Sequence, residues 1–185
     1  MENIIDQIRK FVEKECKKPS SRYGYEPYEF HFLPVRNYAV KLAKKLNADV
    51  EIVELAAWLH DIGSIIFGRE NHHVTGTEIA EKKLREMNYP ENKIAQVKQC
   101  ILNHRGSVNN RRETTEEKII VEADVLANFD NISGIFKAAF YEGLTQGEAT
   151  ISVREKLQRK FEQLCLSESK KLIKSKYEAA MLLLT

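Results

Sequence analysis

The sequence predicts an all-α fold. Apolar residues recur at intervals of three and four positions along nearly every segment, and the two-residue alternation that marks a half-buried strand is almost absent. Turn-forming residues such as Pro19 and Pro90 interrupt this helical pattern. The 185 residues suit one domain, and a composition of 43 % hydrophobic and 30 % charged residues is typical of a globular protein with a buried core. We therefore expect a single all-helical domain over residues 1–185.

The first two helices are expected to flank an aromatic loop. A helical pattern of apolar residues begins near the N-terminus and is lost at residues 17–21, and the stretch 19–27 reads as a loop. The second helix is expected over residues 31–46, with Pro34 in its first turn, where proline is tolerated. This boundary places His31 at or just before a helix start.

The third helix is expected to end on two adjacent polar residues. Asp49 is a suitable N-cap for it, and the helix should end at about residues 61–63, so that His60 and Asp61 lie at its C-terminal end. Asp124 is expected inside a later helix that begins at Thr115. The remaining helices are expected over residues 75–87, 91–104, 132–141, 150–165 and 167–184, with loops at 67–73 and 105–115.

Charge and cysteine content exclude several classes of protein. The 29 basic and 27 acidic residues give a net charge of +2 and are spread along the chain, so no nucleic-acid polymer is expected as a partner. Cys16, Cys100 and Cys165 are widely spaced and form no C-x-x-C pair, which favours a reducing cytosol. No stretch resembles a signal peptide or a membrane span. We expect a cytoplasmic protein without a membrane partner.

Histidines and aspartates at helix ends indicate a metal site. All five histidines fall within the first 104 residues, each at or near a predicted helix end. His60 and Asp61 end an apolar run, and a neighbouring imidazole and carboxylate can bind one divalent ion. The carboxylate could also bridge two ions. Asp124 lies in an apolar segment, where an ionised carboxylate is costly without a cation or hydrogen bonds.

Three stretches carry a resemblance to a known family. They are Glu29-Phe30-His31-Phe32-Leu33-Pro34-Val35, Ala57-Trp58-Leu59-His60-Asp61-Ile62-Gly63 and Val121-Glu122-Ala123-Asp124-Val125-Leu126. In this order they resemble the HD superfamily of metal-dependent phosphohydrolases, whose pattern is a histidine, an adjacent His-Asp pair and a later aspartate. The resemblance implies an HD-domain helical bundle with its motif core at about 25–135 and additional C-terminal helices at about 148–184.

Two further stretches resemble the extended motif of dinuclear members. They are Asn71-His72-His73-Val74-Thr75-Gly76 and Ile101-Leu102-Asn103-His104-Arg105. The resemblance implies that His31, His60, Asp61 and Asp124 bind a first ion, and that His72 and His104 bind a second with Asp61 as the bridge. His72 is favoured over His73 because such members place a histidine four residues before a small residue, although His73 stays open. Mixed nitrogen and oxygen donors favour one or two Mn, Fe, Co, Ni or Zn ions over Mg or Ca.

The resemblance also implies the reaction. The expected function is hydrolysis of a phosphate ester or pyrophosphate bond in a small phosphorylated molecule, with nucleotides as the expected substrates. Asp61 and Arg105 are the candidate catalytic residues, Arg105 as a phosphate contact because it adjoins His104. Many members carry an arginine three residues after the first histidine, whereas this chain departs from that pattern with Pro34 at this position and Arg36 two residues further on.

Other functions remain open at this stage. A dinuclear-iron oxygenase, as in the myo-inositol oxygenase family, uses a similar set of six ligands, and oxygen consumption would separate it from a hydrolase. A nonenzymatic signalling module with the same fold is disfavoured by the complete ligand set. A cyclic-dinucleotide phosphodiesterase is also disfavoured, since Arg105-Gly106-Ser107 follows His104 in place of that family's signature. The amphipathic final segment is read as core or as a subunit contact in a homodimer.

Overall fold

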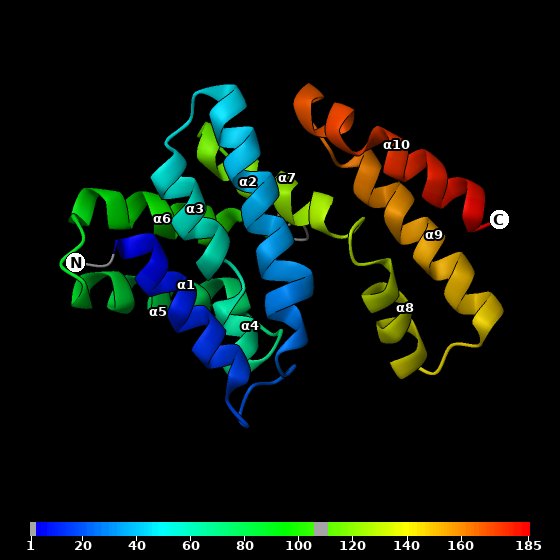
Figure 1. Ribbon diagram of the computed structural model, residues 1–185, viewed down its shortest axis with the longest axis horizontal. Helices are drawn as coiled ribbons and strands as arrows, with labels where there is room; N and C mark the ends of the chain where they lie inside the picture. Colours follow the sequence, from blue (N-terminus) through cyan, green and yellow to red (C-terminus); the bar gives the residue numbers. More distant parts are fainter. Residues whose placement is uncertain (1–2, 106–110) are drawn as a thin grey trace.

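The computed structural model describes residues 3–105 and 111–185, and these residues are mostly helical, without a β-strand among them (Figure 1). The all-α prediction is confirmed. Residues 106–110, part of the loop predicted at 105–115, lie outside the described residues. The elements in chain order are α1 (Ile4–Lys17), η1 (Tyr28–Phe32, a π-helical turn), α2 (Leu33–Leu46), α3 (Val50–Leu59), α4 (Ile62–Phe67), α5 (His72–Glu86), α6 (Glu91–Asn103), α7 (Thr115–Ala127), α8 (Ile132–Tyr141), α9 (Gln146–Glu162) and α10 (Ser167–Leu183).

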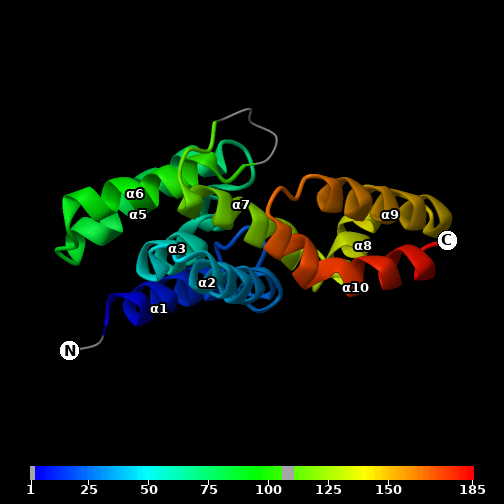
Figure 2. The same ribbon diagram turned by 90° about the horizontal axis from the view of Figure 1, so that it is seen from above.

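Helix α7 joins two groups of helices. Helices α1 to α6 lie together on one side of it, and α8, α9 and α10 form a second group on the other side (Figures 1 and 2). Helix α7 packs against α2, α3 and α6 in the first group and against α10 in the second. The segment that carries Asp124 is therefore the structural link between the motif core and the C-terminal helices.

Helix α3 runs through the core of the first group. It contacts α1, α2, α6 and α7, and every residue from Ile52 to Leu59 is buried. The side chain of Asp49 caps the helix, as predicted, by accepting the backbone N–H groups of Glu51 and Ile52 at 3.0 and 3.1 Å. Because α3 is buried along its length, the residue that follows it, His60, is carried into the interior.

Helix α4 was not predicted, because the third helix was expected to end at about residues 61–63 and a loop to begin at residue 67. The carbonyl oxygen of Asp61 accepts the N–H groups of Ser64 and Ile65 at 2.9 and 3.3 Å, which starts a new helix directly after the turn. Pattern analysis cannot resolve such a restart, since both helices are apolar and only His60 and Asp61 lie between them.

Other helix boundaries also differ from the prediction. Helix α5 begins at His72, three residues before the predicted start, after Asn71 in a left-handed conformation. Helix α9 begins at Gln146 and ends at Glu162, where 150–165 was predicted. Thr145 and Glu148 form a capping box at its start, a signal in the sequence that outweighs the apolar pattern.

Glu122 on α7 holds the second group of helices in place. This glutamate is buried, and its Oε1 atom accepts the backbone N–H groups of Cys165 and Leu166 at 2.6 and 2.9 Å. These two N–H groups lie at the N-terminal end of α10, where a negative charge also interacts favourably with the helix dipole. The sequence analysis gave Glu122 no role, because its partners follow more than 40 residues later.

Gly63 sets the closest approach between α4 and α5. A Cβ atom at this position would overlap the carbonyl oxygen of His72 and lie 2.7 Å from the backbone nitrogen of Gly76. Oγ1 of Thr75 would lie 2.5 Å away and can turn aside, but the two backbone atoms belong to helix α5 and cannot. Gly63 therefore lets the turn at Asp61 pack directly against the first turn of α5.

The Gly63→Ala variant is expected to lose about 1–3 kcal/mol of unfolding free energy, the usual range for overpacking a tight contact. Denaturant unfolding of the two proteins measures this loss. Gly147→Ala is the matched control, because no atom beyond its own stretch of helix backbone lies within 4 Å of a Cβ placed there, and alanine favours helix. Equal stability of Gly63→Ala and wild type would show that the two helices separate at little cost.

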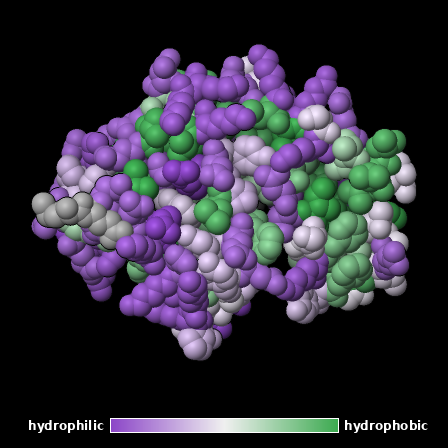
Figure 3. Space-filling model, in the orientation of Figure 1, coloured by the Kyte–Doolittle hydropathy of each residue, from purple (hydrophilic) through white to green (hydrophobic). Residues whose placement is uncertain are grey.

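The surface of the second group is partly apolar. Apolar side chains gather over the end of the molecule formed by α8 to α10 (Figure 3), and these helices carry the exposed residues Phe140, Tyr141, Ile151, Leu182 and Leu183. A homodimer contact through the final segment stays a prediction. Within the described residues, no helix combines the length and apolarity that crossing a membrane requires.

Candidate metal centre

Six side chains from five separate segments converge at one place. His31 comes from η1, His60 and Asp61 from the turn between α3 and α4, His72 from the first residue of α5, His104 from the end of α6, and Asp124 from α7. These are the six residues that the sequence analysis gave as metal ligands. Their donor atoms fall into two sets of three, called here the first and the second donor group. Within each donor group the atoms lie within 4.8 Å of one another.

The first donor group consists of His31, His60 and Asp124. The Nε2 atoms of the two histidines are 3.0 Å apart, and Oδ1 of Asp124 lies 3.6 Å from Nε2 of His31. His60 is fully buried, whereas the side chains of His31 and Asp124 keep 23 % and 22 % of their surface exposed. The group is therefore open to solvent on the side of those two residues.

The second donor group consists of Asp61, His72 and His104. The Nε2 atoms of His72 and His104 are 3.2 Å apart, and they lie 3.2 and 3.5 Å from Oδ1 of Asp61. The other carboxylate oxygen of Asp61, Oδ2, lies 3.2 Å from Nε2 of His31 and 3.7 Å from Nε2 of His60. Asp61 thus presents one oxygen to each group, which is the arrangement of a carboxylate that bridges two ions.

Local backbone geometry frees Asp61 for this position. The residue precedes α4 with φ −110° and ψ 12°, and its carboxylate makes no capping hydrogen bond to that helix. The carbonyl oxygen of Asp61 starts α4 in its place. The side chain can therefore face the histidines.

Backbone carbonyl groups fix three of the histidines in one tautomer. Nδ1–H of His60 donates to the carbonyl oxygen of Ala57 at 2.8 Å, and that of His72 to Arg69 at 2.8 Å. Nδ1–H of His104 donates likewise to Ile101 at 2.6 Å. Since a carbonyl oxygen only accepts, each ring carries its proton on Nδ1, and the neutral ring has a lone pair on Nε2. Metal-binding histidines are commonly oriented by this kind of hydrogen bond.

The centre fits a cation. The Nε2 atoms of His72 and His104 approach to 3.2 Å, yet two lone pairs cannot form a hydrogen bond, so the contact calls for a proton or a metal ion between them. Two carboxylates converge on the same histidines. This mixed set of imidazole nitrogen and carboxylate oxygen is one that divalent transition metals bind.

The protonation states of His60 and of the two carboxylates suit metal binding. Burial lowers the pKa of His60 to about 4, so its imidazole is neutral near pH 7. Burial would raise the pKa of Asp61, but the surrounding histidines outweigh it and hold that pKa well below its usual value. Burial acts in the same way on Asp124, and the charges of Lys160 and His31 lower its pKa. Both carboxylates are therefore ionised.

His73 and Arg105 lie next to the cluster in sequence. The structure brings His72, and not His73, to Asp61 and His104; His73 is buried, and its Nδ1 has no hydrogen-bond partner among the described residues. Burial lowers the pKa of His73, and the charges of His72 and Arg105 add to this effect. The carbonyl oxygen of Arg105 accepts a hydrogen bond from Arg112 at 3.3 Å. A contact between Arg105 and a phosphate stays a prediction.

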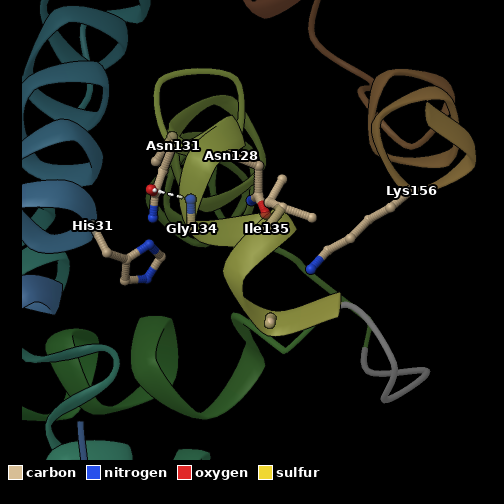
Figure 4. Close-up of a pocket in the computed structure, with 8 residues that line it drawn as sticks. His31, Asn128, Asn131, Gly134, Ile135 and Lys156 are labelled. Carbon is tan, nitrogen blue, oxygen red and sulfur yellow. Dashed lines mark hydrogen bonds between the residues drawn. The ribbon is translucent and has the colours of Figure 1, made fainter. Parts of the chain in front are cut away.

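Two lysines of α9 approach the centre, and the sequence analysis missed both. Nζ of Lys160 lies 3.6 Å from Oδ2 of Asp124. Lys156 lines a cavity of about 160 Å³ that also has His31 in its wall, and its side chain reaches into this cavity from α9 (Figure 4). A signal existed, because Lys156 and Lys160 are four residues apart and so share one face of a helix. Nothing in the sequence directs that face toward Asp124.

Comparison with known proteins gives one family. A model described as the HD domain matches residues 28–129. The tRNA (cytidine(56)-2'-O)-methyltransferase of Thermoplasma volcanium is 32 % identical over 121 residues, which are 62 % of this chain and 36 % of that protein. An uncharacterized protein of Clostridium beijerinckii is 35 % identical over 79 residues, 40 % of this chain and 50 % of that protein. The matches span between about a third and a half of these curated relatives.

Solved structures share the fold at low sequence identity. The crystal structure of Bacillus subtilis YpgQ in complex with ADP has 23 % identity and a TM-score of 0.72, with 97 % of this chain and 92 % of that chain covered. An HD-superfamily hydrolase of Bacillus thuringiensis has 18 % identity and a TM-score of 0.74, with coverage of 97 % and 91 %. A protein of Lactobacillus plantarum has 16 % identity and a TM-score of 0.76, with coverage of 100 % and 95 %.

Proposed function

The chain belongs to the HD-domain family, and from this membership we propose that it is a metal-dependent phosphohydrolase that acts on a small phosphorylated molecule. The observation that carries the proposal is the position of Asp61 between two groups of histidines, with one carboxylate oxygen facing each group. His31, His60 and Asp124 are the proposed ligands of one ion, and His72 and His104 those of a second, with Asp61 shared.

The residues of the chain fit this chemistry. A bound divalent ion supplies a water of lowered pKa and a positive charge that polarises a phosphoryl oxygen. The carbonyl groups that hold His60, His72 and His104 keep the three Nε2 atoms directed at the centre. Lys156 and Lys160 bring positive charge to the open side of the centre, where it can offset the charge of a phosphate. Arg105 is proposed as a further phosphate contact.

We propose a nucleotide as the substrate. The support is the fold shared with YpgQ, which has been solved with ADP, together with a cavity beside His31 that has both polar and apolar walls. The test is a panel of nucleoside mono-, di- and triphosphates assayed for release of phosphate and pyrophosphate with Mn, Co, Ni or Mg. Metal-dependent turnover of at least one member is expected. Oxygen uptake by iron-loaded protein, without phosphate release from any member, would support the oxygenase alternative.

The two groups of donors predict two ions per chain. Under saturating metal, wild type should bind about two ions, and His104→Ala about one, because that substitution removes one of the two histidines of the second donor group. Elemental analysis of the dialysed protein gives the count. His73→Gln is the matched control, since His73 lies outside both groups, and it should retain two ions. One ion in both wild type and His104→Ala would establish a mononuclear centre.

A further inference from the structure

Lys156 is a cation without a counter-ion. Its side chain is half-buried on α9, and among the residues that the structure describes it forms no hydrogen bond or ion pair. Burial lowers the pKa of Lys156, and the positive charges of Lys160 and Arg69 add to this effect. Asp124 and Glu142 act in the opposite direction without balancing it. An ammonium group in this setting would be stabilised by an anion.

The cavity around Lys156 has room for a ligand group. Its volume is about 160 Å³, and its wall is formed by the end of α7, by α8 and by α9, with His31 on the opposite side (Figure 4). Asn131 also lines it, and its Oδ1 accepts the N–H of Gly134 at 3.0 Å, which leaves its Nδ2 group as a donor. Ala127, Ile135 and Ala138 supply apolar wall. An anion here would meet the lysine and lie next to a proposed metal ligand.

The spacing of the two lysines suggests how one substrate could contact both positions. Lys160 lies beside Asp124 at the centre, and Lys156 lies one turn earlier on the same face of α9. One turn of an α-helix is about 5.4 Å long, and two neighbouring phosphoryl groups of a polyphosphate can cover this span. When one phosphoryl group of the substrate lies at the metal centre, the next phosphoryl group would thus lie near Lys156.

We propose that Lys156 binds a second phosphate group of the substrate and so makes the centre selective for molecules with two or more linked phosphates over monophosphates. This inference rests on the proposed phosphohydrolase function and names the substrate class of the same site. It assigns to the C-terminal helices, which lie outside the matched residues 28–129, a part in substrate selection.

The test measures binding of phosphonate analogues of AMP and ADP to Mn-loaded protein by calorimetry. Methylene groups in these analogues replace the oxygens at which hydrolysis would occur, so the result does not depend on turnover. Wild type should bind the ADP analogue more tightly than the AMP analogue. Lys156→Met should weaken binding of the ADP analogue by about tenfold to a hundredfold, the usual range for losing a hydrogen bond to a charged group, and binding of the AMP analogue by less than about threefold.

Two further variants make the result specific. Lys156→Arg keeps the charge and should restore most of the preference for the ADP analogue. Arg154→Met removes a charge from an exposed position of the same helix and should change neither affinity by more than about twofold. Metal content, measured on each sample, should equal that of wild type.

The outcomes separate this inference from the proposed function. Equal binding of both analogues by wild type, or equal weakening of both in Lys156→Met, would overturn the role of Lys156. A Lys156-dependent preference in a protein that hydrolyses no nucleotide would support the phosphate site and refute the proposed nucleotide hydrolysis. Hydrolysis with a preference that Lys156→Met leaves unchanged would refute only the phosphate site.

Discussion

Asp61→Ala is expected to lose both bound ions and to lower kcat/KM on the best substrate by several orders of magnitude. The reason is geometric, because its two carboxylate oxygens lie 3.2 Å from Nε2 of His31 and 3.2 Å from Nε2 of His72, so that one substitution removes a donor from both groups. Metal catalysis contributes several kcal/mol, and each ~1.4 kcal/mol corresponds to a factor of ten in rate. Elemental analysis and steady-state kinetics measure the two losses.

The fold should survive this substitution. The carboxylate of Asp61 caps no helix, so the circular dichroism of Asp61→Ala should match that of wild type. His60→Ala should likewise lose metal and activity, since Nε2 of His60 belongs to the first donor group. Asp6→Ala, which removes an aspartate on α1 whose side chain is 45 % exposed, is the control and should retain metal and activity. Two ions retained in both Asp61→Ala and His60→Ala would remove these residues from the centre.

Asp124→Asn is expected to lower activity by several orders of magnitude and to reduce the metal count to about one. Asparagine keeps the size and much of the hydrogen-bonding capacity of aspartate but removes the charge, so a structural role for Asp124 predicts only a small loss. A ligand role predicts a large one, because Asp124 is the carboxylate of the first donor group. The measurements are metal content and kcat/KM for the same preparation. Near wild-type turnover with unchanged metal affinity would refute the four-residue assignment of His31, His60, Asp61 and Asp124.

Lys160 affects the stability expected for the metal-free variant. From the sequence alone, Asp124→Asn should raise the stability of the metal-free protein or leave it unchanged, since it removes a buried charge. In the structure Lys160 lies 3.6 Å from the carboxylate, and both side chains keep about a quarter of their surface exposed. Ion pairs in contact with solvent contribute about 0–1 kcal/mol to stability. We therefore expect Asp124→Asn to change the unfolding free energy of the metal-free protein by that amount or less, as measured by thermal unfolding.

The position of the six clustered residues could be anticipated because each belongs to a short motif at the end of, or inside, an apolar helix. His60 and Asp61 follow a segment that is buried throughout, so any fold that buries it must carry them inward. The order of the motifs resembles that of the HD family, and this resemblance predicted that the six residues lie close together in the fold. Choosing His72 over His73 rested on the family's spacing, and the structure places His72 at the cluster.

The second group of helices could not be placed in this way. Lys156 and Glu122 gain their positions from how α8, α9 and α10 fold back on α7, and no local pattern encodes that packing. Lys156 alone reads as a solvated helix residue, and Glu122 reads as a polar neighbour of Asp124. Helix α4 escaped prediction for a different reason, since only a hydrogen-bonded turn at Asp61 separates it from α3.

The hydrogen bonds of Glu122 have a consequence for the thermodynamics of substrate binding. One carboxylate oxygen holds two N–H groups at the start of α10, and α10 in turn packs against α9, so the helix that carries Lys156 is fixed before any substrate arrives. A binding group on an ordered helix loses little conformational entropy when its partner docks. Without the Glu122 carboxylate, the same contacts would form from a more mobile helix. Affinity would then fall through entropy alone, with every contact to the substrate still present.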